Sequence, residues 1–189
     1  MCIISGVVPA DLLSIIRGMV KNGQFTVDSY NDALERLQFY SYESESKPCP
    51  VPISFSKKIS KLSGKAISNW VHIRNFPLVV KDLIQDGEDP VLHLGLLLHE
   101  IVERLTAQEF LHYEIDILED KIDNYMKERA LVRERLPSIF HRPKPKHHYM
   151  RYVPKVSSFL SMTTRVFQIM DFFVLISVGW SVAHSCTGK

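Results

Sequence analysis

The residues with the clearest capacity for chemistry stand together in the stretch HRPKPKHHYMRYVP, residues 141–154. Its cations could neutralise phosphates, its histidines could bind a metal, and its tyrosines could stack on nucleic-acid bases. The other interpretation is a proline-stiffened connector whose polar residues face water, and the composition alone favours it. The candidate contacts for nucleic acid are Arg142, Lys144, Lys146, His147, His148 and Tyr149.

Neither group of histidines predicts a metal site. His147 and His148 are adjacent, so their side chains would point to opposite faces of a strand, or about 100° apart on a helix. The segment HEIVE holds His99, Glu100 and Glu103, and it lacks the second histidine of the zinc-protease pattern HExxH. A polar strip on a helix surface explains these three residues better. We therefore expect no metal and no cofactor.

The composition indicates one domain with a real core. The chain has 189 residues, 46% of them apolar, and a formal net charge of +2. Its basic residues are unevenly distributed, because residues 127–151 hold eight lysines and arginines against two glutamates, whereas the preceding YEIDILEDKID is acidic. Such asymmetry either creates a local positive field that attracts phosphate or is a solvated surface.

The cysteines and the N-terminus point to a reducing intracellular compartment. Cys2, Cys49 and Cys186 are far apart and odd in number, so they form neither a disulfide framework nor a zinc pattern. The first residues, MCIISGVVPADLL, have no basic segment and no long apolar core, so we expect no signal peptide.

Apolar periodicity predicts a mainly α fold, an irregular helical domain built around a long antiparallel helix pair. One helix is expected from Pro9 to Asn22, another after the N-cap Thr26, and two short helices on either side of Pro77. The long pair is predicted at residues 90–104 and 107–136.

Capping residues define the ends of that long pair. Asp89 is the expected N-cap of the first helix, with Pro90 at its first position. Thr106 and Glu109 have the pattern of a capping box at the start of the second helix. The predicted contacts between the two helices are Leu97, Ile101, Leu111, Ile115 and Leu118.

Residues 155–189 form an apolar tail of different character. The stretch FQIMDFFVLISVGWSVA is apolar apart from Asp171, and it is shorter than the roughly 20 apolar residues that a membrane span needs. A buried or loosely packed tail is favoured over membrane association through residues 166–183.

Four blocks of the chain, in order, carry a family resemblance. They read SGVVPADL at residues 5–12, KLSGKAISNWVHIRNFPLVVKDLI at 61–84, DPVLHLGLLLHEIVERLTA at 89–107 and PKPKHHYM at 143–150. Together they resemble a transposase-derived family related to the CACTA-type (EnSpm-like) cut-and-paste DNA transposases. The resemblance covers about residues 5–154, and it implies an association with DNA and a nuclear location.

The departures from that family are also informative. The family continues beyond its PKHHY signature with a glycine-proline pair and a W..RFE.KH block, and nothing after Pro154 matches them. The chain reads MCIIS where the family reads MHD, so we expect truncation at both ends and a tail foreign to the family. Transposases of this type need three carboxylates to hold two metal ions. No complete set can be carried onto this sequence, and we expect no catalysis.

The sequence therefore predicts a non-catalytic remnant of a transposase-like protein, divided into a helical region at residues 5–154 and a tail at 155–189. Binding of nucleic acid through the basic His/Lys/Tyr segment is the first functional hypothesis. A helical protein-interaction module with an unidentified partner, a fragment without selected function, and a membrane-associated fragment are the alternatives.

Overall fold

The computed structural model describes residues 3–39, 44–53, 59–107, 112–152 and 154, and every regular element within them is helical. This confirms the predicted mainly α fold. A π-helix, Ile3–Val7 (η1), leads directly into the first α-helix. The α-helices are α1 (Val8–Lys21), α2 (Val27–Arg36), α3 (Ala66–Val80), α4 (Pro90–Thr106), α5 (His112–Arg135) and α6 (Pro145–Met150), with a 3-10 turn, η2, at Ser44–Ser46.

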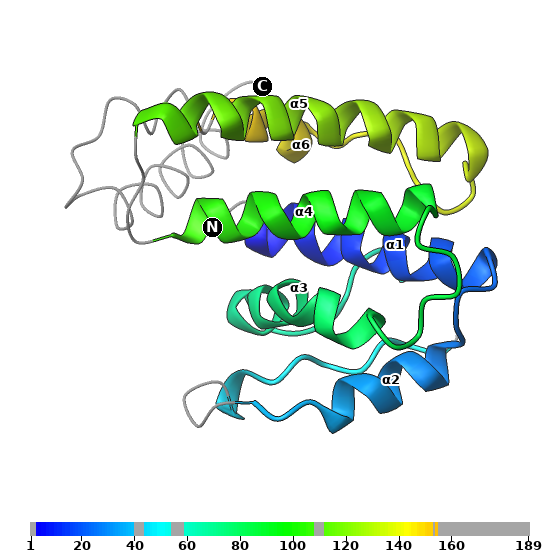
Figure 1. Cartoon of the computed structure of the whole chain (residues 1–189). Helices are drawn as coiled ribbons and strands as arrows, with labels where there is room; N and C mark the ends of the chain where they lie inside the picture. The colour runs from blue at the N-terminus through cyan, green and yellow to red at the C-terminus, as the bar shows by residue number, and fades with distance from the viewer. Residues whose placement is uncertain (1–2, 40–43, 54–58, 108–111, 153, 155–189) are drawn as a thin grey trace, which may run out of the picture.

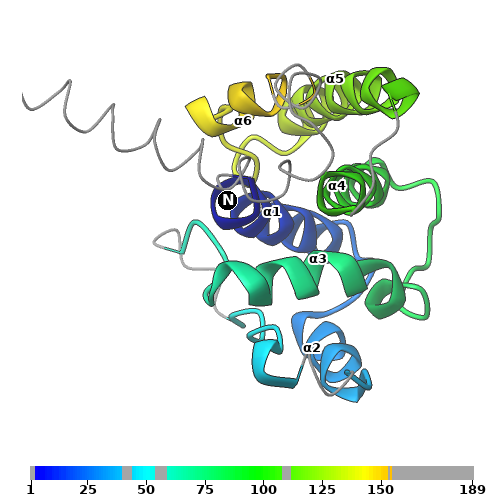
Figure 2. The ribbon, with the colours of Figure 1, turned by 90° about the vertical axis from the view of Figure 1, so that its left-hand side faces the viewer.

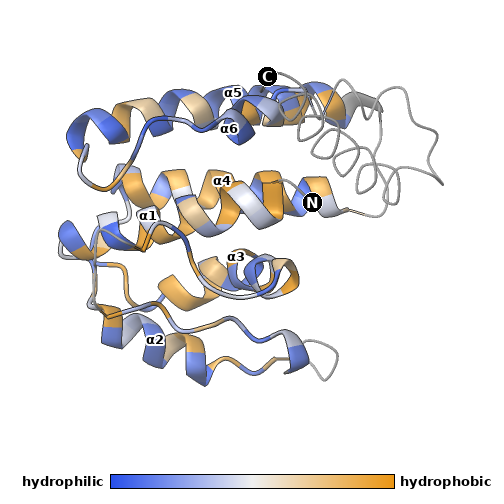
Figure 3. Ribbon diagram, turned by 180° about the vertical axis from the view of Figure 1, so that it is seen from behind, coloured by the Kyte–Doolittle hydropathy of each residue, from blue (hydrophilic) through white to orange (hydrophobic). Residues whose placement is uncertain are grey.

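The helices stack in layers (Figure 1). α5 and α6 form one outer layer, α4 and α1 the layer beneath it, followed by α3 and then α2. The apolar residues gather on α1 and α4, whereas the segment that leads into α6 is hydrophilic (Figure 3). The core therefore centres on α1 and α4, whose fully buried side chains include Leu12, Leu13, Ile16, Leu94 and Leu98.

Two predicted helix starts are confirmed by their capping contacts. The Thr26 Oγ1 accepts from the Ser29 backbone N–H at 3.1 Å, and the Ser29 hydroxyl accepts from the Thr26 N–H at 3.1 Å. The Asp89 Oδ1 accepts from the Val91 N–H at 2.7 Å, ahead of Pro90 at the first position of α4. Both caps satisfy N–H groups that a helix start would otherwise leave unpaired.

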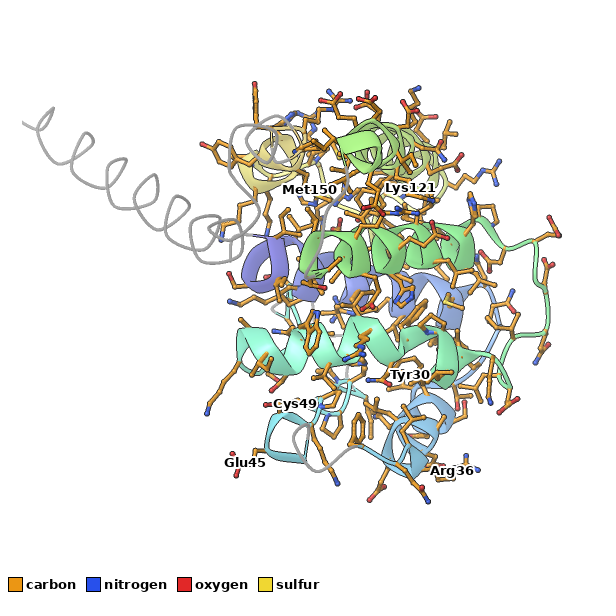
Figure 4. The ribbon with its side chains drawn as sticks, turned by 60° about the vertical axis from the view of Figure 1, so that its left-hand side comes forward. Tyr30, Arg36, Glu45, Cys49, Lys121 and Met150 are labelled. Atoms are coloured by element: carbon orange, nitrogen blue, oxygen red, sulfur yellow. The ribbon has the colours of Figure 1, made fainter. Side chains whose placement is uncertain are left out.

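The predicted long helix pair is present. α4 and α5 lie side by side and run in opposite directions (Figure 1). Leu97 and Ile101 on α4 and Ile115 and Leu118 on α5 are all buried, while Leu111 lies outside the described residues. Lys121, on the side of α5 nearer α4 in Figure 4, forms an ion pair with Glu100.

The prediction of two helices split at Pro77 is wrong, because α3 continues through this proline. Proline has no N–H, so a helix that contains it loses the bond to the carbonyl four residues earlier, here that of Ile73. The His99 Nδ1 on α4 lies 3.1 Å from the Ile73 carbonyl oxygen and supplies a donor in place of the missing one. A contact between helices thus offsets the local cost of the proline.

The prediction that Thr106 is an N-cap is also wrong. Thr106 is the last residue of α4, and its hydroxyl donates to the Val102 carbonyl at 2.9 Å. The same oxygen accepts from the Trp70 indole N–H at 3.3 Å. The hydroxyl is therefore engaged within α4 and α3, and Glu109 lies outside the described residues.

A buried neutral pair joins α2 to α3. Tyr30 lies between these helices (Figure 4), and its hydroxyl is 2.9 Å from the His72 Nε2. Burial lowers the pKa of His72 to about 4, because a charged imidazolium is poorly solvated there. Burial likewise raises the pKa of Tyr30. Both groups are therefore uncharged at neutral pH.

One helical stretch of the described residues, Ile3–Lys21, is long and apolar enough to cross a membrane by length and composition. In this fold its side chains are the centre of the core, since Leu12, Leu13, Ile15 and Ile16 are at most 1% exposed. The predicted membrane candidate at residues 166–183, the tail at 155–189 and hence the domain boundary lie outside the described residues.

Candidate nucleic-acid interface

The proline-rich stretch forms a helix at its centre, so the expectation that its prolines keep it extended throughout needs correction. Residues Pro145–Met150 are α6, and Pro145 occupies the first helical position, where a missing N–H costs nothing. Lys144, the residue before this proline, is extended with φ −81° and ψ 161°. The segment is therefore an extended approach followed by a short helix.

α6 lies against the N-terminal end of α1 (Figure 2) and contacts η1. Gly6 in η1 lies close to the side chain of Lys146 in α6. A Cβ atom added to Gly6 would lie 2.5 Å from the Lys146 Cδ and 2.9 Å from its Nζ. The stem of Lys146 thus lies over Gly6, and it would have to shift to make room for a larger residue there, although Lys146 as a whole remains exposed.

His147 anchors α6 to the core. Its side chain is 2% exposed, and its Nε2 lies 2.9 Å from the Asp11 Oδ2. The Lys144 backbone N–H donates to the His147 Nδ1 at 3.0 Å, which places the ring proton on Nε2 and makes Nε2–H the donor to Asp11. The sequence predicts His147 as a nucleic-acid contact, whereas the structure places it inside the fold with both ring nitrogens engaged there.

Asp11 is the centre of a buried network that joins α1, α5 and α6. Its Oδ2 accepts from the Tyr125 hydroxyl, from the Arg129 Nε at 2.9 Å and from His147, and its Oδ1 accepts from the Arg129 Nη2 at 3.0 Å. Burial acts to raise the pKa of Asp11, but the hydrogen bonds from His147 and Arg129 outweigh it and lower the pKa to about 2. The carboxylate is therefore charged at neutral pH.

Arg129 belongs to this network and not to the basic surface on which its sequence position would place it. It is 4% exposed, and its Nη1 also donates to the His141 carbonyl at 3.1 Å. The approach to α6 is thus fixed at residue 141 by Arg129 and at residue 147 by Asp11. Burial acts to lower the pKa of Arg129, but the hydrogen bonds and the charge of Asp11 outweigh it and raise the pKa, so the guanidinium stays charged.

The remaining predicted contacts lie on the outside of this anchored segment. Arg142, Lys144, Lys146 and His148 are exposed, and we call these four residues the basic face. Tyr149 is half-buried. Beyond α6, the Arg151 Nε lies 2.9 Å from the Asp123 Oδ1 of α5 in an exposed ion pair. The structure therefore separates the six predicted residues into one anchor, four surface groups and one partly covered ring.

Sequence reasoning missed Asp11, Tyr125 and Arg129 as partners of the histidine. The available signal was Asp11, a charged residue inside the apolar run VVPADLL at the start of a predicted helix. A buried carboxylate needs a cationic or hydrogen-bonding partner. Which residue supplies it cannot be read from spacing along the chain.

The HEIVE segment is structural. His99 contacts the Ile73 carbonyl, Glu100 pairs with Lys121, and the Glu103 Oε1 lies 4.0 Å from the Arg74 Nε. No group of three or more histidine, cysteine, aspartate or glutamate side chains within the described part of the chain is arranged to hold a metal ion.

Comparison of the chain with protein-family models, with curated proteins and with solved structures finds no match in any of the three. The transposase-like resemblance thus rests on the four sequence blocks. The first and last of these blocks meet in space, because Asp11 stands in SGVVPADL and His147 in PKPKHHYM.

Proposed function

We propose that the chain is a non-catalytic, transposase-derived protein that binds nucleic acid through the basic face. The observation that supports this most directly is the anchoring of α6, in which a buried His147 donates to Asp11 at 2.9 Å while the neighbouring Lys144, Lys146 and His148 are exposed. The cations are thus carried by a held backbone and not by a loose loop.

Electrostatics supports the same proposal. Residues 141–152 contain four lysines and arginines besides three histidines and no acid. Cations that are held in place bind phosphates with less loss of conformational entropy than cations on a flexible segment. Contacts of this kind give affinity without base specificity, so binding should be insensitive to sequence.

Titration of binding against salt tests this proposal. Fluorescence anisotropy with labelled DNA should give a log–log slope of roughly −2 to −3 for about three phosphate contacts on a duplex. The double variant Lys144→Ala/Lys146→Ala should flatten that slope by about 2 and weaken every sequence alike.

The matched control is Lys21→Ala/Lys81→Ala, which removes the same charge at the C-terminal ends of α1 and α3. This variant should retain the wild-type slope apart from a small general loss. Equal binding by the wild type and the Lys144/Lys146 variant would overturn the proposal in favour of an interaction module or a chain without selected function.

The absence of catalysis has its own test. Pure protein incubated with supercoiled DNA and Mg²⁺ or Mn²⁺ should leave the DNA intact. Metal-dependent nicking that disappears when a single acid is substituted would overturn this part of the proposal.

A further inference from the structure

An exposed aromatic ring extends the basic face. Tyr152 is 60% exposed, and it is the one aromatic residue among the large apolar side chains that stand exposed in the described part of the chain. It lies directly beyond α6, on the segment that carries Lys144 and His148. An isolated exposed apolar residue needs no explanation, but a ring next to clustered cations has a chemical use.

The backbone after α6 fixes where this ring lies. The Arg151 N–H donates to the His148 carbonyl at 3.2 Å, and the Tyr152 N–H donates to the Tyr149 carbonyl at 3.0 Å. Bonds of this three-residue type bring side chains three positions apart over one another. Tyr152 therefore follows Tyr149 by one tight turn, just beyond His148, and the Asp123–Arg151 ion pair joins that turn to α5.

The combination of ring and cations differs from what a duplex needs. In a duplex the base faces are stacked inside the helix and only phosphates, sugars and base edges can be reached. A single strand offers free base faces, and proteins that bind it without sequence preference combine a cationic track with aromatic rings on which bases stack.

We propose that the basic face together with Tyr152 takes single-stranded nucleic acid, with one base stacked on the Tyr152 ring and neighbouring phosphates on Lys144 and Arg142. This inference rests on the proposed function, because it names the class of nucleic acid that the same surface binds.

Anisotropy with three probes of matched length tests the inference, namely an oligothymidylate, a DNA duplex, and an abasic strand that has the phosphates but no bases. The wild type should bind the oligothymidylate more tightly than either of the others. Tyr152→Ala should weaken oligothymidylate binding by about 5- to 160-fold, the range that corresponds to the loss of one stacked base. The same change should alter duplex and abasic binding less than twofold.

Two control variants separate stacking from other effects. Tyr152→Phe keeps the ring and should bind as the wild type does, which excludes a role for the hydroxyl. Leu131→Ala removes a side chain of similar exposure, 53%, from α5 and should change no affinity.

The outcomes distinguish this inference from the proposed function. Equal wild-type affinity for the oligothymidylate and the abasic strand, or a neutral Tyr152→Ala, would overturn the inference. If Lys144→Ala/Lys146→Ala still weakened binding in that case, the proposed function would stand alone. Failure of the wild type to bind any of the three probes would overturn both.

Discussion

Two aspartate–arginine pairs, one joining α1 to α5 and the other joining the turn after α6 to α5, differ in burial and not in length. The Arg129 Nε lies 2.9 Å from the Asp11 Oδ2, with side chains 5% and 2% exposed. The Arg151 Nε also lies 2.9 Å from the Asp123 Oδ1, with side chains 50% and 55% exposed. The two pairs have the same distance between nitrogen and oxygen, one in the protein interior and one in water, so comparing them isolates the effect of burial.

The difference shows that the partners of a carboxylate, and not its distance to one cation, decide what it contributes. Asp123 has water as an alternative partner, so its pair contributes little. Asp11 has lost its water, and three side chains replace it, from Tyr125, Arg129 and His147. Removing a charge from such a network leaves the opposite charge buried without compensation.

The largest expected effect follows from breaking the buried pair. Asp11→Asn keeps the shape of the side chain but leaves the Arg129 guanidinium uncompensated, so we expect the free energy of unfolding to fall by about 3–5 kcal/mol. Urea unfolding followed by circular dichroism measures this loss. A loss below about 1 kcal/mol would mean that the network contributes no more than the exposed pair.

Asp11→Asn should loosen the attachment of α6 as well as lower the stability of the whole fold. In Asp11→Asn an uncharged amide replaces the carboxylate that accepts from His147, and its oxygen is a weaker acceptor, so α6 should be released before the core unfolds. Hydrogen exchange of the Met150–Tyr152 amides should accelerate more than that of α4. Uniform acceleration would indicate that α6 and the core unfold together.

The next effect concerns pH, and His72 sharpens the comparison because it is as buried as Asp11 but has an uncharged partner. Its folded pKa is about 4, whereas an unfolded histidine titrates near 6.5. Between these values the unfolded chain takes up a proton that the folded chain refuses, so stability should fall as pH falls from about 6.5 to about 4. The loss should be on the order of 2–3 kcal/mol by pH 4, from about 1.4 kcal/mol per pKa unit.

Asp11 should affect the stability of the fold in the adjacent pH range, below about pH 4. Its folded pKa is about 2 and lies below the unfolded value of about 3.9, so its contribution is present above pH 4 and is lost as pH falls towards 2. His72→Gln should remove only the loss of stability between about pH 6.5 and pH 4. Asp11→Asn should remove only the loss of stability below about pH 4. Urea midpoints measured at several values between pH 7.5 and pH 2.5 check this, and a His72→Gln profile identical to wild type would contradict it.

A smaller effect is expected at His99, which is half-buried. His99→Ala leaves the Ile73 carbonyl without the donor that replaces the missing Pro77 N–H, and an unpaired carbonyl of this kind costs about 1–2 kcal/mol. His93→Ala on the same helix is the matched control, because His93 is exposed. Equal thermal midpoints for the two variants would show that water satisfies the Ile73 carbonyl.

These contacts also explain how far the sequence predicts the structure. The N-caps Thr26 and Asp89 and the helices α4 and α5 were predicted correctly from signals confined to a few neighbouring residues, whereas the similar capping signal at Thr106 was not. The continuation of α3 through Pro77 was not predicted, because the compensating donor, His99, lies 26 residues beyond the Ile73 carbonyl that it satisfies.

The candidate site was predicted in composition but not in arrangement. The basic residues of the segment were identified, whereas the burial of His147 depends on Asp11, which is 136 positions earlier in the chain. Alternating prolines and lysines favoured an extended connector, and a first-turn proline is compatible with a helix as well. Only the tertiary contact decides between the two.

The smallest expected effect closes the comparison at the exposed pair. Asp123→Asn should cost less than about 1 kcal/mol of stability, because both side chains are about half exposed and water replaces the lost contact. The same change removes a negative charge beside the basic face and frees Arg151 to meet a phosphate. We therefore expect nucleic-acid affinity to rise about two- to threefold at low salt, with a salt slope steeper by at most about 0.9 on a duplex. Anisotropy at 50 and 200 mM salt measures this difference in affinity, and Asp116→Asn on the same helix is the control. Weaker binding by Asp123→Asn than by the wild type would indicate that the Asp123–Arg151 pair is needed to hold the turn after α6 in place.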